Sequence, residues 1–383
     1  MARPPDATGR LVLVLGLGCL ASSLATRALD PLVGLLAAEF ATTAATVALL
    51  GTAYALPYAL IQPVLGPFGD AAGKRRVVRA CLLVLAAALL AAAFAPDLAS
   101  LAALRVLAGA ASGGVFPLCI ALVGDHVPLE RRQIALTRLS VAGQTGAVGG
   151  GAVAALLEPF IGWRGVLALC ALPAVVGFLA MRGGAPEPRR RFDPAEAMTR
   201  YRVILAQPAA RVLYAAVFIE GTLVFGIFPF IAPLLAERGL GGTAEAGLAI
   251  IGFACGGFLF AALAPALLRG LGQARMVVLG GALGAAGLIG LALAPAAAVV
   301  IACMAVLGLG YPMVHSSIQT RVTEVAPAAR GSAVSLHAFS FFLGQSLGPV
   351  AMGGMRALVG QDAALVLSAA GVAAVAVWIA TWR

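Results

Sequence analysis

Residues 66–76 read Gly-Pro-Phe-Gly-Asp-Ala-Ala-Gly-Lys-Arg-Arg, a short stretch with one acid, glycines and three consecutive cations. It lies between two long apolar runs, at about 43–67 and 77–95. A helix needs about 20 apolar residues to cross the hydrocarbon core of a bilayer, and each run is that long. We therefore expect a tight, charged loop that joins two membrane spans.

The composition of the whole chain supports a membrane protein. The 383 residues are 61% hydrophobic and 11% charged, whereas a soluble domain carries about 25% charged residues. Spans in lipid are helices or closed barrels, because the backbone must satisfy its own hydrogen bonds, and continuously apolar runs favour helices. We predict an all-α membrane protein with twelve transmembrane helices, at about 11–38, 43–67, 77–95, 98–122, 135–157, 163–181, 209–236, 244–268, 276–294, 297–320, 333–355 and 362–381.

The positive charge follows the predicted topology. The net charge is +10, and 21 of the 26 Lys and Arg fall in the N-terminus, the even-numbered connections, the first four residues after such a connection (Arg79, Arg138 and Arg211) or the C-terminal residue. Cytoplasmic loops of membrane proteins carry an excess of Lys and Arg. We expect both termini in the cytoplasm and no nucleic-acid partner. The five exceptions are Arg27, Arg105, Arg164, Arg238 and Arg356.

Motifs of other protein classes are missing from the sequence. The six cysteines all lie within predicted spans and lack zinc-ligand spacing, so we expect buried thiols, no disulfides and no metal. The sequence contains no Walker loop, no His-Glu-x-x-His, no Gly-x-Ser-x-Gly and no paired intramembrane aspartates. These observations argue against an enzyme, a bound cofactor and built-in ATP hydrolysis, so the energy source is expected to be an ion gradient.

The chain repeats itself with a period of about 200 residues. Three pairs of segments lie at offsets of 200, 199 and 201: 66–76 with 266–276, Asp125-x-x-Pro128 with Glu324-x-x-Pro327, and Gly143-Gln144 with Gly344-Gln345. We infer two pseudo-symmetric six-helix halves, 1–181 and 208–383. The polar stretch 182–207 between them is predicted to be a cytoplasmic linker with a helix on anionic lipid.

The loop at 66–76 resembles the signature of the major facilitator superfamily, G-x-x-x-D-x-x-G-[RK]-[RK]-[RK]. Ala71 stands where an arginine often follows the acid, and the other fixed places are filled by Gly66, Asp70, Gly73, Lys74, Arg75 and Arg76. The resemblance implies a substrate site between the halves near the midplane.

The same resemblance implies that the signature loop is a gate. Asp70 would hold the cytoplasmic side shut near the start of predicted span 11, because helix N-termini favour negative charge. The cations at 74–76 would pair with acids and lipid headgroups, or they would serve only to fix topology.

Glu220 is the strongest candidate for proton coupling. It lies nine residues into predicted span 7 after Arg211, roughly 13 Å deep at 1.5 Å per residue. A charge inside the membrane is costly, and desolvation favours the neutral carboxyl. Glu220 can therefore exchange a proton as water access changes, and we also expect it to contact substrate. The alternative is a structural acid paired with a basic residue across the halves.

Arg27 and Asp30 are spaced i, i+3 in predicted span 1, so a continuous helix would place them on one face. Followed by Pro31, they resemble the Arg-x-x-Asp-Pro pattern of drug-efflux-type members. The resemblance implies that they face the cavity, with Arg27 toward substrate and Asp30 in proton coupling. A local ion pair near the outer mouth is the alternative.

Arg105 begins Arg-x-x-x-Gly109-x-x-x-Gly113 in predicted span 4. This resembles a superfamily motif whose arginine is implicated in proton coupling, and the alternative is an ion pair that closes the outer side. The two glycines are explained by close helix packing, since small residues let backbones approach.

The stretch Gly143–Gly151 in predicted span 5 resembles the Gly-rich motif of superfamily antiporters, although Val148 replaces its central proline. Gln144 in this span and Gln345 in predicted span 11 both lie near mid-depth. Each is expected to hydrogen-bond a substrate, with a bond to a neighbouring helix as the alternative.

A few aromatic and imidazole side chains complete the polar inventory. Tyr54 in predicted span 2 lies near mid-depth and is expected to contact substrate. Tyr58 in the same span and Tyr311 in predicted span 10 are further polar aromatic residues. His315 and His337 lie nearer the cytoplasmic side, which favours a gate or packing role. A proton-relay role stays open for them because histidine titrates near physiological pH.

These observations predict a secondary active transporter that moves a small organic solute by alternating access. The patterns in spans 1 and 5 favour proton-coupled efflux of the 12-span drug:H+ antiporter type. The alternative is a proton-coupled importer or a facilitator, and a non-transporting sensor is a further one. We expect a monomer in a bacterial inner membrane, with substrate, protons and lipid as its partners.

Overall fold

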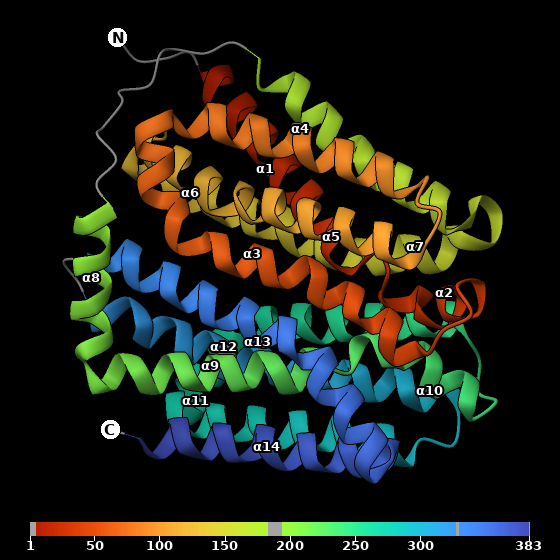
Figure 1. Ribbon diagram of the computed structural model, residues 1–383. Helices are drawn as coiled ribbons and strands as arrows, with labels where there is room; N and C mark the ends of the chain where they lie inside the picture. The colour runs from red at the N-terminus through yellow and green to blue at the C-terminus, as the bar shows by residue number, and fades with distance from the viewer. Residues whose placement is uncertain (1–4, 183–193, 327–328, 383) are drawn as a thin grey trace. The chain divides into compact units, whose positions relative to one another are not determined.

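The computed structural model describes residues 5–182, 194–326 and 329–382, and this part of the chain is helical (Figure 1). The all-α prediction is confirmed. The elements are α1 (Pro5–Arg27), η1 (Asp30–Leu32), α2 (Val33–Glu39), α3 (Ala44–Ala72), α4 (Lys74–Ala92), α5 (Leu98–Gly113), α6 (Val115–His126), α7 (Leu129–Ala180), α8 (Pro194–Ala206), α9 (Pro208–Phe225), η2 (Phe228–Phe230), α10 (Ile231–Glu237), α11 (Thr243–Leu293), α12 (Ala297–Val325), α13 (Arg330–Val359) and α14 (Gln361–Thr381).

All twelve predicted spans coincide with helical segments in the described residues. Eight helical stretches are long and apolar enough to cross a membrane, and two of them, Ile134–Ala180 and Thr243–Leu293, each contain two predicted spans. The remaining two predicted spans correspond to α4 and α13. The first is too rich in cations for the same criterion, because four of its first six residues are Lys or Arg. The chain is an integral, multi-pass membrane protein.

Single glycines replace two of the expected loops. The helix α7 has one non-helical residue, Gly162, with φ 65° and ψ 167°, and α11 has Gly272 with φ 73° and ψ 166°. Residues with a Cβ rarely adopt this backbone conformation, whereas glycine adopts it freely. One residue is therefore enough to separate predicted span 5 from span 6 and span 8 from span 9.

Predicted spans 1 and 7 are interrupted in the same way. The first ends as α1 at Arg27 and resumes in η1, and the second ends as α9 at Phe225 and resumes in η2. A proline, Pro31 or Pro229, is the second residue of each 3-10 turn, and proline cannot continue a regular helix. The expectation that Arg27 and Asp30 share a face of one continuous helix is therefore wrong.

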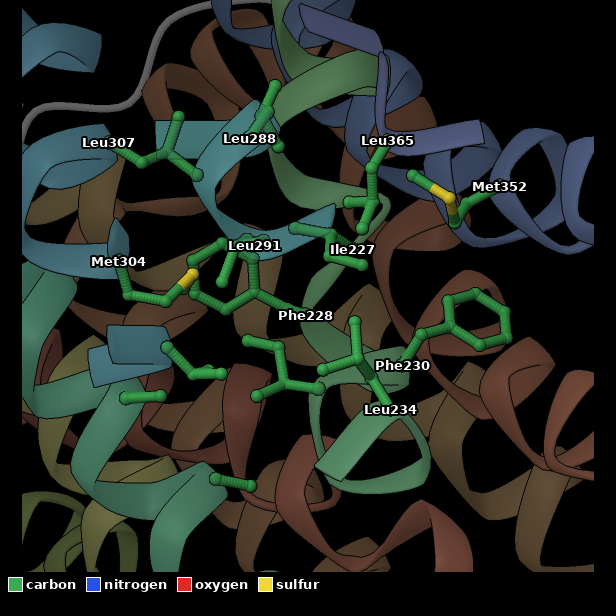
Figure 2. Packing of buried hydrophobic residues seen from close by; sticks show 14 of the residues in the cluster. Ile227, Phe228, Phe230, Leu234, Leu288, Leu291, Met304, Leu307, Met352 and Leu365 are labelled. Carbon is green, nitrogen blue, oxygen red and sulfur yellow. The ribbon is translucent and has the colours of Figure 1, made fainter. Parts of the chain in front are cut away.

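Contacts divide the chain into two compact units, one of Met1–Leu29 with Ala53–Ala197 and one of Asp30–Thr52 with Met198–Arg383. The predicted halves 1–181 and 208–383, with a linker at 182–207, stay a prediction. The second unit has a core where η2 and α10 pack with α11 to α14. Figure 2 shows part of this cluster, including Phe228, Leu291 and Met304.

The internal repeat is visible in how closely helices pack within each unit. In the first unit, a Cβ on Gly109 of α5 would clash with the backbone carbonyl of Tyr54 in α3. In the second, a Cβ on Gly308 of α12 would clash with the carbonyl of Phe253 in α11. Both members of the second pair lie 199 residues after their counterparts in the first. The repeat therefore extends from sequence to backbone contacts.

A second pair of contacts corrects the predicted register of one helix. Gly146 of α7 packs against the carbonyl of Leu20, and Gly344 of α13 packs against the carbonyl of Phe218. These counterparts are 198 residues apart, not 201 as the Gly-Gln match suggested. Gly143, the expected counterpart of Gly344, instead faces the ring of Phe116. The three-residue difference is almost one helical turn.

Candidate functional site

Glu220 and His315 form a buried pair in the second unit. Glu220 lies in α9 and is 3% exposed. A hydrogen bond of 2.8 Å joins its Oε2 to Nδ1 of His315, which lies in α12. A carboxyl group next to an imidazole is a pair that can share or exchange a proton.

Two buried polar atoms beside this pair have no hydrogen-bond partner among the described residues. One is the second carboxyl oxygen, Oε1 of Glu220, and the other is Nε2 of His337 in α13. The rings of His337 and His315 have centroids 5.3 Å apart. Buried polar groups are nearly always paired, so unpaired ones call for a functional explanation. Here one belongs to Glu220, which is bonded to His315, and the other belongs to the ring next to His315.

Aromatic rings surround the buried pair on the side of α12 and α13. The His315 ring lies 4.7 Å from that of Phe341 and 5.1 Å from that of Tyr311. Tyr311 in turn meets Phe225 at 5.1 Å and Phe253 at 5.9 Å. This packing leaves only 16% of the His315 side chain and 4% of the Glu220 side chain exposed. The electrostatic interaction of the pair is stronger there, because the local dielectric constant is low.

A small cavity lies against the carboxyl group. It has room for one water centre, about 10 Å³. Glu220 and Tyr311 are its polar side chains. The rest of the wall comes from α9, α11, α12 and α14 and is apolar: Val224, Gly280, Gly284, Leu307, Val314, Val372 and Val375.

Arg105 forms a different kind of site in the first unit. It is 1% exposed, and its NH1 donates to the carbonyl of Ala25 at 2.7 Å while NH2 donates to that of Thr26 at 3.3 Å. The guanidinium lies 4.2 Å from the ring centroid of Tyr54. Ala25 and Thr26 are in the last turn of α1, where carbonyls lack helical partners. Arg105 therefore caps α1 at the point where this helix breaks.

A hydroxyl network continues from this cap. Tyr54 Oη donates to the carbonyl of Ser22 at 3.0 Å, and Ser112 Oγ lies 2.8 Å from Ser22 Oγ. Gln62, one turn beyond Tyr58 in α3, donates to the carbonyl of Gly113 at 3.1 Å. These bonds hold α1, α3 and α5 together. Tyr54, expected to contact substrate, has its hydroxyl occupied by this network.

The remaining predicted site residues are dispersed. Gln345 is buried in α13 and Gln144 is exposed in α7, so the two glutamines lie in unlike surroundings. Arg27 is half-buried at the end of α1, and Asp30 is buried in η1. Nothing in the structure tests their predicted roles, which stay predictions. In the described residues, no group of three His, Cys, Asp or Glu could hold a metal ion.

The signature loop forms a tight turn between α3 and α4. Gly73 has φ 94° and precedes Lys74, the first residue of α4. Lys74 Nζ makes an ion pair of 2.7 Å with Asp125 at the end of α6. Arg75 is half-buried and Arg76 is exposed. The side chain of Asp70 and the surroundings of Gly66 lie outside the described part, so the predicted gate stays untested.

The sequence identified Glu220 as a site but not its partner. His315 follows Tyr311 by four residues, which places both on one face of α12. That spacing was the only local sign that the imidazole faces an aromatic, buried environment. The pairing itself joins residues 95 positions apart.

Comparisons with known proteins agree with this architecture. The Major Facilitator Superfamily profile matches residues 15–349. The chain is 28% identical over 203 residues to the gallate transporter of Pseudomonas putida, covering 46% of this chain and 44% of that one. It is 29% identical over 125 residues to the 4-hydroxybenzoate transporter PcaK of Pseudomonas aeruginosa, covering 33% and 28%. The aligned part is thus less than half the length of either relative.

A solved structure shows the same fold over nearly the whole chain. The crystal structure of a D-xylose-proton symporter matches with a TM-score of 0.81 at 16% identity, and the match covers 98% of this chain and 97% of the symporter. Together with the signature loop, the paired close contacts and the profile match, this likeness supports one conclusion. The chain belongs to the major facilitator superfamily.

Proposed function

We propose that the chain is a secondary transporter that takes up a small aromatic carboxylate together with protons, and that the protons pass through Glu220. As a member of a transporter superfamily, the chain is not an enzyme. The bacterial relatives support a location in the plasma membrane.

The substrate class is suggested by the relatives. Those described above are named for gallate and 4-hydroxybenzoate, and each of these compounds is a benzene ring with hydroxyl groups and one carboxylate. A site for such compounds needs apolar, aromatic walls and a few polar groups that fix orientation. Aromatic residues at Phe225, Phe253, Tyr311 and Phe341 supply such walls in the second unit.

Charge balance supports coupling to protons. Carrying a carboxylate into a cell that is negative inside costs about 2.3 kcal/mol per charge at 100 mV. One proton carried with the anion cancels this cost and lets a pH gradient drive accumulation, and each further proton adds the membrane potential to the driving force. A buried group that binds a proton reversibly is therefore needed on the transport path.

The single observation that carries the proposal is the Glu220–His315 hydrogen bond in a buried, aromatic environment, with Oε1 of the carboxyl unpaired among the described residues. When the His315 imidazole is protonated, its Nδ1 donates to Oε2 of Glu220 and stabilises the carboxylate. The unpaired oxygen leaves the group open to exchange with water or with a neighbouring donor. Arg105, in contrast, is held by backbone carbonyls.

Drug efflux by proton antiport becomes the second candidate. It drew on the Arg27–Asp30 spacing and on the Gly-rich stretch of predicted span 5. The relatives named for aromatic acids do not support the drug-antiporter subtype. The helix α1 ends at Arg27, so the first pattern does not lie on one continuous helix. Direction of transport separates the two candidates.

The test is uptake by proteoliposomes that contain the purified chain, with an imposed gradient that is acidic outside. Labelled 4-hydroxybenzoate, gallate and benzoate are compared with neutral xylose. We expect the acids to accumulate only when the gradient is present, and xylose to stay out. Extrusion of these acids in exchange for entering protons would instead support the antiporter, and no response to any acid would contradict the substrate class.

A further inference from the structure

We propose that Glu220, His315 and His337 form a three-member proton relay across α9, α12 and α13, with His315 in the middle. This inference rests on the proposed function, because it supplies a route by which Glu220 gains its proton. It assigns to His337 the proton-relay role that the sequence left open, in place of the gate or packing role that its position favoured.

His315 contacts both other members. Its Nδ1 lies 2.8 Å from Oε2 of Glu220, and its ring centroid lies 5.3 Å from that of His337 at an interplanar angle of 58°. Rings at this separation exchange a proton directly after a small rotation or through one bridging water, which serves almost as well as a direct bond. The two steps place all three groups in one connected path.

The two ends of the path carry the unpaired atoms. Oε1 of Glu220 and Nε2 of His337 are both buried and lack a hydrogen-bond partner among the described residues. Leaving a buried donor or acceptor unpaired destabilises the folded protein. In a cluster that only held helices together, the two unpaired atoms would lower stability without any compensating function. A relay needs an open atom at each end, because a proton must arrive at one and leave from the other.

The surrounding contacts hold His337 in place. One turn before it, the carbonyl of Ala333 accepts a hydrogen bond of 3.1 Å from Tyr214 of α9. One turn after it, Phe341 packs on the His315 ring at 4.7 Å. The helix α13 is thus tied to α9 and α12 on either side of His337. Fixed positions of donor and acceptor favour rapid proton transfer.

The cavity that Glu220 lines offers an exit for the proton. The water-sized cavity there has Glu220 and Tyr311 as its polar side chains, and its walls from α11 and α14 contribute only glycine and valine. Among the residues that line it, Glu220 is the one that carries a carboxyl group. In the proposed relay, a water in this cavity accepts the proton that Glu220 releases.

Each proton is accounted for along this path. A proton accepted at His337 moves to His315, and His315 passes a proton from Nδ1 to Oε2 of Glu220. Glu220 turns its protonated oxygen toward the cavity and releases the proton there. Each imidazole is then left as its other tautomer and returns to the first by a ring rotation before the next proton arrives. One proton enters and one leaves per cycle, and no oxidant, reductant or cofactor is required.

The chain contains three histidines, which makes a direct test possible. The full-length protein is labelled with ¹⁵N-histidine, and the ring-nitrogen signals, which report tautomer and protonation state, are followed by NMR against pH. His126 of α6 is the internal reference, because its Nδ1 is bonded to the carbonyl of Leu122 in the other unit. Variants H126Q, H315Q and H337Q assign the three signals.

The decisive comparison uses Glu220→Gln. The relay predicts that this change alters the titration of His315 and of His337 together and leaves His126 unchanged. A response of His315 alone would overturn the proposal, because the path would end at His315. A His337 ring that stays in one neutral tautomer at every pH would overturn it equally.

Transport provides a second readout. His337→Gln keeps a polar side chain of similar size, but glutamine cannot carry a proton. We therefore expect proton-driven uptake to fall roughly tenfold, while substrate exchange without a gradient continues. Unchanged proton-driven uptake in a folded H337Q protein contradicts the relay. If the parent takes up no acid at all, the proposed function fails, and the NMR comparison still decides the relay.

Discussion

The two units share a packing scheme but differ in the chemistry buried within it. Gly109 against Tyr54 in the first unit has its counterpart in Gly308 against Phe253 in the second. The first unit buries Arg105, whose guanidinium donates to two carbonyls of α1. The second buries an acid with one bonded and one unbonded oxygen.

We infer that this difference separates a structural polar group from a functional one. A buried cation with hydrogen bonds to carbonyls holds its helix in one position. A buried carboxyl with an open oxygen beside an imidazole can change its protonation state. We infer that, in the duplicated scaffold, the buried polar group of the first unit supports the fold and that of the second unit carries protons. Substitutions in the two units should therefore have different effects.

The largest effect is expected where the units are alike. Gly308→Ala places a methyl group against the carbonyl of Phe253, and Gly109→Ala does so against Tyr54. Overpacking of this kind costs about 1–3 kcal/mol or more, so both variants should show a large loss of folded, monodisperse protein. Gly257→Ala is the control, because its Cβ would meet only a carbonyl at 3.8 Å. Thermal unfolding in detergent gives the answer, and a normal melting point for Gly308→Ala would contradict the packing.

Removing the Arg105 cap should come next. Arg105→Met leaves the carbonyls of Ala25 and Thr26 without their donor, which costs about 1–3 kcal/mol. We expect a lower melting temperature and equal losses in proton-driven uptake and in substrate exchange, since the helix itself shifts. Arg105→Lys should recover part of both. A selective loss of the proton-driven mode would show that Arg105 acts in coupling after all.

His315→Gln should act selectively. It removes the imidazole that faces Glu220 but leaves a polar side chain in α12. We expect proton-driven uptake to fall at least tenfold, with substrate exchange retained. His126→Gln, in the other unit, should change neither. Equal loss of both modes in His315→Gln would mean that the pair is a structural contact.

Filling the cavity beside Glu220 should have a smaller effect. A Cβ on Gly284 would lie 3.1 Å from Cγ1 of Val372 and 3.7 Å from Cδ1 of Leu307, so small shifts accommodate it. If the cavity holds a water that takes the proton, Gly284→Ala should slow proton-driven uptake roughly threefold by displacing it. Initial rates measured beside Gly257→Ala test this, and identical rates would exclude the cavity as an exit.

The signature-loop ion pair should contribute least to stability. The side chains of Lys74 and Asp125 are 19% and 49% exposed, and pairs that water reaches are typically worth less than about 1 kcal/mol. A double-mutant cycle of Lys74→Gln and Asp125→Asn should give a coupling energy in that range. A much larger value would show that the loop carries more of the fold than its exposure suggests.

Much of the fold was predictable because continuous apolar runs leave few alternatives in a membrane. The helical breaks were harder. Pro31 and Pro229 mark the breaks in spans 1 and 7. Nothing in the sequence distinguishes Gly162 and Gly272 from the other glycines, of which this chain has 47 in all. The span-11 register was misjudged because a Gly-rich stretch matches itself at several offsets, whereas backbone contacts allow one.

The site was predictable only as far as single residues carry a cost. Glu220 stood out because a carboxyl inside a span is expensive wherever it points. His315 did not, since imidazole is tolerated in many settings and its partner lies 95 residues away. Arg105 was expected to act in proton coupling or to pair with an acid. Its partners include the carbonyls of Ala25 and Thr26, and backbone carbonyls belong to every residue type and leave no trace in the sequence.

The most direct test of the central claim is Glu220→Gln in proteoliposomes, assayed in two modes with the same labelled aromatic acid. We predict that uptake driven by a proton gradient falls at least a hundredfold, because glutamine cannot carry the proton. Exchange of labelled for unlabelled substrate without a gradient should persist. Retained proton-driven accumulation in the variant would contradict the account and move proton coupling away from the second unit's buried pair.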